Sequence, residues 1–232
     1  MQLERPLHPS RYTEYKLVTS ILDGTYPQGS ALPGERALSE QIGVTRPTLR
    51  ETLQRLASEG WITIQHGKPT VVNDYWKEGG LSLLGTMAKY GDFLREDIII
   101  HLLEFRIILV PFFARLAAVH APKIISEYLD HTQDIEDKAE AFADFDWELQ
   151  VLMARYSRNP IYPLLLNDFG AIFKAMALRY FSVQKARDVS RLYYLELARA
   201  LDKSAEDVEQ VVRSVMEKST DIWRERKTFQ GG

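Results

Sequence analysis

The order of five short segments near the N-terminus limits most strongly what this chain can fold into. Apolar spacing predicts helices at about 12–23, 35–42 and 45–59, each followed by a glycine, with a threonine cap before the third. Two short apolar runs, 61–64 and 70–72, then predict a pair of strands joined by a tight turn. This order of three helices and a two-stranded ribbon predicts a winged helix-turn-helix.

The rest of the chain has the apolar spacing of helices. A polar segment with paired glycines comes first, and helices are then predicted at about 93–120, 122–138, 140–156, 161–182, 188–201 and 204–227. We therefore predict a mainly α fold with two domains. The predicted parts are a winged helix-turn-helix domain of three helices and a small β-hairpin wing at 1–73, a linker at 74–80, an all-α helical-bundle effector domain at 81–228, and a tail at 229–232.

Composition excludes several classes of protein. The chain of 232 residues has no cysteine, so it has no disulfide framework, thiolate nucleophile or cysteine-based zinc site. The N-terminal residues have no apolar core like that of a signal peptide, and the longest uncharged stretch in the most apolar region, 107–114, is far too short to span a bilayer. We expect a cytoplasmic protein with no membrane partner.

Charge becomes informative only when it is placed on the predicted elements. The whole chain has a net charge of −3, whereas residues 36–68 carry five basic and three acidic residues, for a net charge of +2. Arg46 and Arg50 share one face at the start of the third helix, where arginine can bind guanine through two hydrogen bonds. Hydroxyls of Thr45 and Thr48 suit phosphate oxygens. The alternative is a simple cap at Thr45 and a solvated pair of arginines.

The turn between the two strands is the second candidate contact with DNA. His66, Gly67 and Lys68 lie at its tip, where glycine permits close approach to a minor groove and lysine can meet phosphate. The alternative is an ordinary polar hairpin loop. A phosphate-binding P-loop is rejected because Gly60 lies seven positions before Gly67, not five, and a strand follows.

Two polar side chains stand out in the apolar helices of the second half. Arg106 lies in the most apolar helix, and a buried guanidinium needs an anion or several acceptors. Its partner is either a carboxylate such as Asp144 or Asp146, or the polar part of a ligand. Tyr180, among apolar residues, carries a hydroxyl that needs an acceptor if it is buried.

The block PGERALSEQIGVTRPTLRETLQRLASEGWITIQHGKPTVVN resembles the DNA-binding domain of the GntR superfamily of bacterial regulators. The likeness to the fatty-acid-responsive members of that superfamily continues through 102–106, 159–162, 179–181 and 222–223, so it covers nearly the whole chain. The resemblance implies a homodimeric transcriptional regulator of fatty acid metabolism. Such a regulator represses degradation genes, activates genes for unsaturated fatty acid synthesis, and leaves double-stranded operator DNA when long-chain fatty acyl-CoA binds.

The resemblance also implies site residues. The positions that match operator contacts are Arg36, Thr45, Arg46, Thr48, Arg50, His66 and Gly67, and we add the neighbouring Lys68. Pro47 stands where the best-known pattern has threonine, so one phosphate contact is lost there. The positions that match effector contacts are Arg106, Tyr180, Ser219 and Trp223. Met216 and Lys218 depart from that ligand site, where glycine and glutamate are usual.

Three alternatives compete with this interpretation: an enzyme, a metal-binding protein and a regulator of another metabolite. An enzyme acting on acyl-CoA has no support, because the chain lacks the GxSxG, HExxH and Rossmann motifs and any Cys–His pairing. A metal site is disfavoured, because only three histidines lie in the second domain and none pairs at helical spacing. A GntR-type regulator of a different small metabolite, such as an organic acid, remains the alternative. We therefore expect no enzyme activity, no metal and no cofactor.

Overall fold

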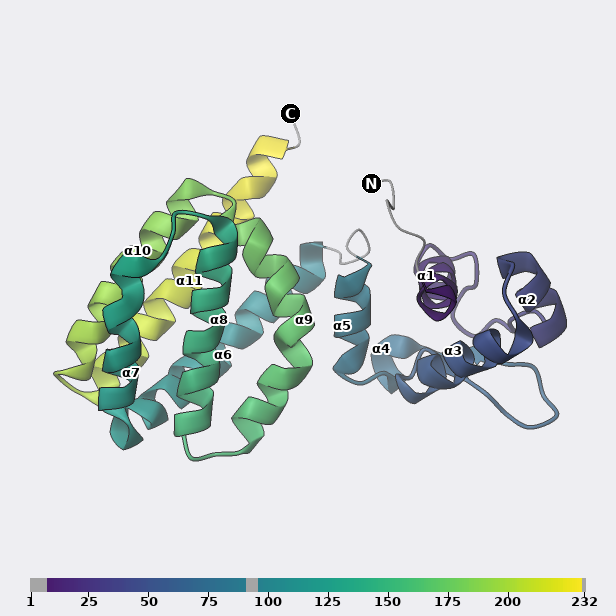
Figure 1. Cartoon of the computed structure of the whole chain (residues 1–232), viewed down its shortest axis with the longest axis horizontal. Coiled ribbons are helices and arrows are strands. Elements are labelled where there is room, and N and C mark those ends of the chain that lie inside the picture. Colours follow the sequence, from purple (N-terminus) through teal and green to yellow (C-terminus); the bar gives the residue numbers. More distant parts are fainter. Residues whose placement is uncertain (1–7, 91–95, 231–232) are drawn as a thin grey trace. The chain divides into compact units, whose positions relative to one another are not determined.

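The structure is a computed structural model that describes residues 8–90 and 96–230. The chain forms two compact units, residues 1–94 and 95–232, which we describe separately. Figure 1 shows short helices in the first unit and long packed helices in the second. The predicted mainly α fold is confirmed.

The first unit has the predicted winged helix-turn-helix order. Its elements are α1 (Pro9–Leu22), α2 (Glu35–Ile42), α3 (Arg46–Ser58), β1 (Ile62–Thr63), β2 (Val71–Val72), α4 (Tyr75–Glu78) and α5 (Ser82–Lys89). The strands pair antiparallel, with Ile62 opposite Val72 and Thr63 opposite Val71. The strands are shorter than the predicted runs 61–64 and 70–72, since only two residues of each run pair with the other strand.

Local sequence signals set the geometry of the helix-turn-helix. Gly43 ends α2 in the left-handed backbone conformation with a φ of 78°, which residues with a side chain rarely adopt. The Thr45 side chain then accepts a hydrogen bond from the backbone of Thr48 and caps α3. Apolar residues of α1, α2, α3, α5 and the two strands form the core of the unit, together with Trp61; the most buried are Leu17, Val18, Leu38, Leu49, Leu56, Trp61, Ile62, Val72 and Met87.

Residues 74–90 differ from the prediction. The segment predicted as a linker contains α4, and α5, predicted to belong to the second domain, packs within the first unit. The backbone at Gly79 passes close to Gly60, just after the end of α3. A Cβ atom on Gly60 would lie only 2.8 Å from the Cα of Gly79. The Thr86 hydroxyl also donates to Glu59 at 2.8 Å. These contacts place the division by packing later in the chain than the predicted boundary.

The second unit is a bundle of long helices. Its elements are α6 (Glu96–His120), α7 (Pro122–Leu129), a 3-10 turn η1 (Asp130–Asp134), α8 (Ala139–Tyr156), α9 (Ile161–Phe181), α10 (Gln184–Leu201) and α11 (Ala205–Gln230). The predicted helix at 122–138 is thus divided into α7 and η1, and α11 extends into the predicted tail. In Figure 1, α6 lies behind α8 and packs most extensively on α11.

The core of the bundle is formed by apolar side chains from every long helix. Phe113, Phe142 and Tyr194 are its largest fully buried side chains. Aromatic contacts link the helices, since the Phe142 ring of α8 lies 5.5 Å from that of Phe181 in α9. Arg191 of α10 stacks over Phe142, with its guanidinium carbon 4.8 Å from the ring centroid.

Helix α9 is long and apolar enough to cross a membrane by length and composition alone. One such helix is weak evidence, because core helices of soluble proteins pass the same test. In this fold α9 packs along α8. It also provides several side chains to an internal pocket of the bundle.

Candidate functional sites

The N-terminal half of α3 presents two arginines to solvent. Arg46 and Arg50 are each more than half exposed, whereas Leu49, between them in the sequence, is fully buried. The Glu35 carboxylate at the start of α2 accepts from Arg50 Nε at 2.7 Å and lies 3.9 Å from Arg46 Nη2. Because this bond uses Nε, it leaves the two terminal nitrogens of Arg50 able to donate to an acceptor pair such as that of guanine.

Polar groups surround these arginines at the start of the helix. The hydroxyls of Thr45 and Thr48 lie 2.9 Å apart, and Thr45 also caps the helix. The capping alternative is therefore true for Thr45, and it is compatible with a contact to phosphate. Pro47 occupies the first turn, is exposed, and brings no hydroxyl or N–H. Arg36 on α2 is exposed and pairs with Glu40 at 3.1 Å.

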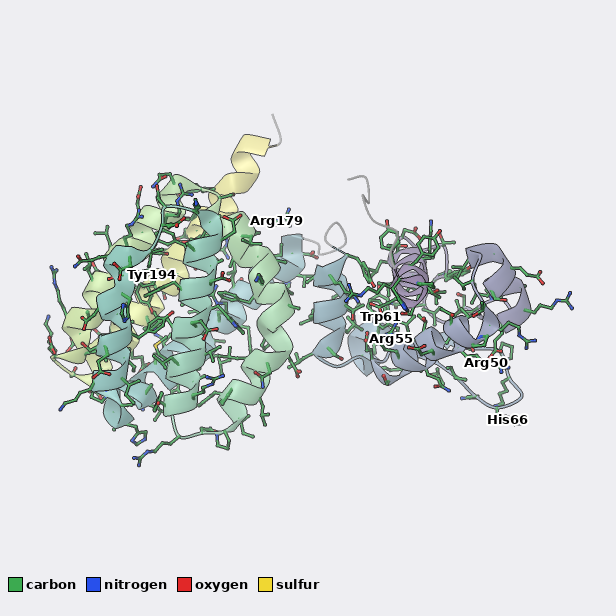
Figure 2. The ribbon with its side chains drawn as sticks, viewed as in Figure 1. Arg50, Arg55, Trp61, His66, Arg179 and Tyr194 are labelled. Atoms are coloured by element: carbon green, nitrogen blue, oxygen red, sulfur yellow. The ribbon has the colours of Figure 1, made fainter. Side chains whose placement is uncertain are left out.

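The wing has the form that a groove contact needs. His66, Gly67 and Lys68 are exposed, and Gly67 has a φ of 71° that permits the tight turn. The Lys68 backbone N–H donates to the Gln65 carbonyl at 3.2 Å and closes that turn. In Figure 2, Arg50 and His66 appear at the same end of the first unit, one on α3 and the other on the wing. The arrangement can present side chains to adjacent DNA grooves.

The second unit contains a mostly apolar pocket with a cavity volume of about 80 Å³. Helices α6, α8, α9, α10 and α11 all contribute to its wall. All four residues predicted to contact an effector line it, namely Arg106, Tyr180, Ser219 and Trp223. A mostly apolar pocket between bundle helices, with a few polar groups that converge on it, is a usual place for a ligand site.

The structure distinguishes between the two carboxylates considered for Arg106. Asp146 Oδ2 lies 3.9 Å from Arg106 Nη2 inside the pocket. Asp144 instead faces Lys174 at 3.7 Å on the exposed side of the bundle. Arg106 also stacks over Phe173, with its guanidinium carbon 5.4 Å from the ring centroid.

Asp146 is held by its own set of donors. Its Oδ2 accepts from the Gln150 amide at 2.7 Å, and its Oδ1 accepts from the Tyr194 hydroxyl at 3.4 Å. Burial raises the pKa of Asp146 above its ordinary value, although Arg106, Gln150 and Tyr194 each favour the carboxylate. Tyr194, labelled in Figure 2, is fully buried in α10.

The other predicted effector residues differ in the state of their polar atoms. The Tyr180 hydroxyl is buried and has no hydrogen-bond partner among the described residues. The Ser219 hydroxyl donates to the Met216 carbonyl of its own helix at 2.8 Å. Met216 lines the pocket beside Trp223, whereas Lys218 is exposed and lies outside the wall. Of the two departures from the expected ligand site, only Met216 therefore changes the shape of this pocket.

Sequence reasoning missed two parts of these sites. Glu35 was not identified, because its pairing with α3 depends on how α2 crosses that helix. Gln150 was not identified either, although its spacing of four residues from Asp146 is a recognisable signal on an otherwise apolar helix face. Within residues 8–90 and 96–230, no three His, Asp or Glu side chains are grouped closely enough to hold a metal ion.

Comparisons with known protein families divide the chain at 72/73, which lies beside the boundary predicted from the sequence and before the division by packing at 94/95. Residues 10–72 match the model of the bacterial regulatory proteins of the gntR family, and residues 73–229 match the FadR C-terminal domain. A "Fatty acid metabolism regulator protein" of Shewanella pealeana is 41% identical over 217 residues, which are 93% of this chain and 91% of the relative. One from Klebsiella pneumoniae is 40% identical over 225 residues, which are 96% and 94% of the two chains.

Solved structures support the fold. The Listeria monocytogenes protein Lar, described as controlling expression of the agr system, has a TM-score of 0.66 to this chain. The two chains are 15% identical, and the match covers 97% of this chain and 99% of Lar. An Escherichia coli structure, McbR/YncC, has a TM-score of 0.51 at 16% identity over 96% of this chain and all of that one. At such identities the likeness concerns the fold alone.

Proposed function

Because this chain belongs to the GntR family of bacterial regulatory proteins and carries the FadR C-terminal domain, we propose that long-chain acyl-CoA releases it from operator DNA. The chain is a DNA-binding regulator of fatty acid metabolism and not an enzyme, as its relatives over more than nine-tenths of its length are such regulators. We propose further that it acts in the cytoplasm, represses degradation genes and activates genes for unsaturated fatty acid synthesis.

The proposed DNA contact uses both parts of the winged unit. Arg46 and Arg50 read base edges in the major groove, and His66 and Gly67 enter the adjacent minor groove. The residues that contact phosphate are Arg36, Thr45, Thr48 and Lys68, with Pro47 contributing shape but no hydrogen bond. The exposure of these groups on α2, α3 and the wing supports this assignment, with Thr48 alone among them partly buried.

The observation that carries the effector proposal is the pocket in the second unit. Four residues that are far apart in the sequence, Arg106, Tyr180, Ser219 and Trp223, line one mostly apolar cavity. The apolar lining suits an acyl chain, because burial of each methylene contributes about 0.8 kcal/mol. The alternative, a different small metabolite, would leave most of this apolar wall without a partner.

We propose a homodimer as the active form. One winged unit reads too few base pairs for specific binding, so two units acting on a palindrome are needed. Ile108, Phe112 and Val119 share one face of α6 at separations of four and seven residues, and all three are exposed. An exposed apolar stripe of this kind supports association with a second copy.

The proposed switch is a change in how two docked winged units are spaced. Two half-sites on DNA fix the separation of the two α3 helices, so a small domain rotation prevents simultaneous docking. Linkage requires that operator DNA weaken acyl-CoA binding by the same factor as acyl-CoA weakens DNA binding. We expect this coupling to be about 1–3 kcal/mol.

Calorimetric titration of the full chain with a long-chain acyl-CoA, with and without operator duplex, tests the proposal. Scrambled duplex is the control, since it should not change the affinity for acyl-CoA. Equal affinity with and without operator would show that acyl-CoA is not an inducer. No binding of acyl-CoA, together with stabilisation by a small organic acid, would favour the alternative effector.

A further inference from the structure

The pocket in the second unit contains a balanced pair of opposite charges. Among the described residues that line it, only Arg106 and Asp146 carry a formal charge. Their side-chain atoms lie 3.9 Å apart, and Asp146 is 8% exposed. Burial opposes the ionised form of Asp146, whereas Arg106, Gln150 and Tyr194 favour it. With Asp146 ionised, the positive charge of Arg106 has its counter-ion inside the protein, and the two charges of the pocket balance.

Two hydrogen-bond donors of the same pocket have no acceptor. Arg106 Nε and the Tyr180 hydroxyl are buried, and neither has a hydrogen-bond partner among the described residues. A buried donor without an acceptor has lost its bonds to water, so a ligand that supplies an acceptor gains by satisfying it. A carbonyl oxygen does so without bringing a charge.

The oxygens of Asp146 are directed to the protein and not to a ligand. One accepts from Gln150 and the other from Tyr194, which holds the carboxylate in place beside Arg106. A second carboxylate entering the pocket would face the charge of Asp146 at close range and in surroundings of low polarity. Like charges in such surroundings repel strongly, and Arg106 cannot compensate both.

We propose that Asp146 is a specificity-determining residue that makes the pocket accept neutral acyl derivatives and reject free fatty acids. The carbonyl oxygen of a thioester accepts hydrogen bonds from the unsatisfied donors of Arg106 and Tyr180 and leaves the Arg106–Asp146 ion pair intact. The carboxylate of a free fatty acid can take the same donors only against the charge of Asp146. This inference rests on the proposed function, because it assumes that acyl chains enter this pocket.

The test compares two ligands that differ in charge and hardly in shape. Binding of hexadecanoate and of hexadecanamide to the full chain is measured by displacement of a fluorescent acyl probe, below the concentrations at which either aggregates. The readout is the ratio of the two dissociation constants within each protein. For the native chain we expect the amide to bind about tenfold more tightly than the acid, or better.

The variant Asp146→Asn removes the opposing charge and keeps the size of the side chain. We expect its preference for the amide to fall about tenfold, because Arg106 is then free to pair with the carboxylate of the acid. The double variant D146N/R106Q should bind the acid more weakly than D146N does, because the arginine that pairs with the carboxylate of the acid is gone. Asp144→Asn is the matched control, since Asp144 lies on the same helix but faces Lys174 outside the pocket.

The outcomes separate this inference from the proposed function. An unchanged ratio in D146N would overturn the role of Asp146 even if hexadecanoyl-CoA binds and releases operator. Failure of hexadecanoyl-CoA to bind would overturn the proposed effector, while the ratio of acid to amide still reports the electrostatics of the pocket. Failure of all three ligands would overturn both. If D146N does not fold, Arg106→Gln gives the opposite test, because it should increase the preference for the amide.

Discussion

Substitution of Glu14 by glutamine should destabilise the winged unit by about 2–3 kcal/mol. Glu14 is 4% exposed, and its carboxylate lies 2.7 Å from Arg55 Nη2 and 2.5 Å from Lys89 Nζ and accepts from the Tyr90 hydroxyl. Each hydrogen bond to a charged group contributes about 1.5–3 kcal/mol. We discount the sum because Arg55 and Lys89 are 35% and 44% exposed and regain water when the carboxylate is lost.

The pH dependence of stability should identify this carboxylate. Burial alone would raise the pKa of Glu14, but hydrogen bonds from Lys89 and Tyr90 and the charges of Lys89 and Arg55 lower it below 4.5. A carboxyl group with a lowered pKa in the folded state stabilises that state above its unfolded pKa. The contribution is lost as pH falls through the lowered value, so the difference between native chain and variant should shrink below about pH 4.5.

Urea unfolding followed by hydrogen exchange of peptides from 8–90 measures this effect in the winged unit alone. The two units need not unfold together, so a single transition of the whole chain would not suffice. Glu51→Gln is the matched control, because Glu51 faces the same Arg55 at 4.0 Å but is exposed. A loss in E14Q no larger than in E51Q, or a loss independent of pH, would refute this account of the network.

Three further predictions concern DNA binding, capping and the core. Arg46→Ala or Arg50→Ala should cost about 1–3 kcal/mol of operator binding and relax discrimination at one base pair, measured against scrambled DNA; equal losses on both duplexes would show a phosphate contact only. Thr45→Ala should lower stability by about 1 kcal/mol through loss of the α3 cap, measured by urea unfolding, and Thr45→Ser should restore most of it. Phe142→Ala should cost about 3–5 kcal/mol, because the residue is fully buried, whereas the exposed Phe112→Ala should cost much less.

Local signals in the chain were sufficient to predict the helix-turn-helix. Glycine at the end of α2, threonine before α3 and the apolar spacing of both helices act within a few residues, so the helix-turn-helix follows from the chain alone. Resemblance to known regulators was needed to select Ser219 and Trp223, since a serine and a tryptophan on one helix face carry no chemistry of their own. The fold then brought them beside Arg106 and Tyr180 in one pocket.

Which charged side chains form ion pairs depends on the packing of the helices. Asp144 and Asp146 are equivalent candidates in the sequence, yet the packing of α8 turns one to Lys174 and the other to Arg106. Docking of α5 on the winged unit likewise depends on Glu14 and Lys89, which are 75 residues apart. Helical periodicity tells which residues share a face, but the rotation of that face toward a distant helix is set by the packing of the whole core. Pairings between distant side chains are therefore decided by the fold.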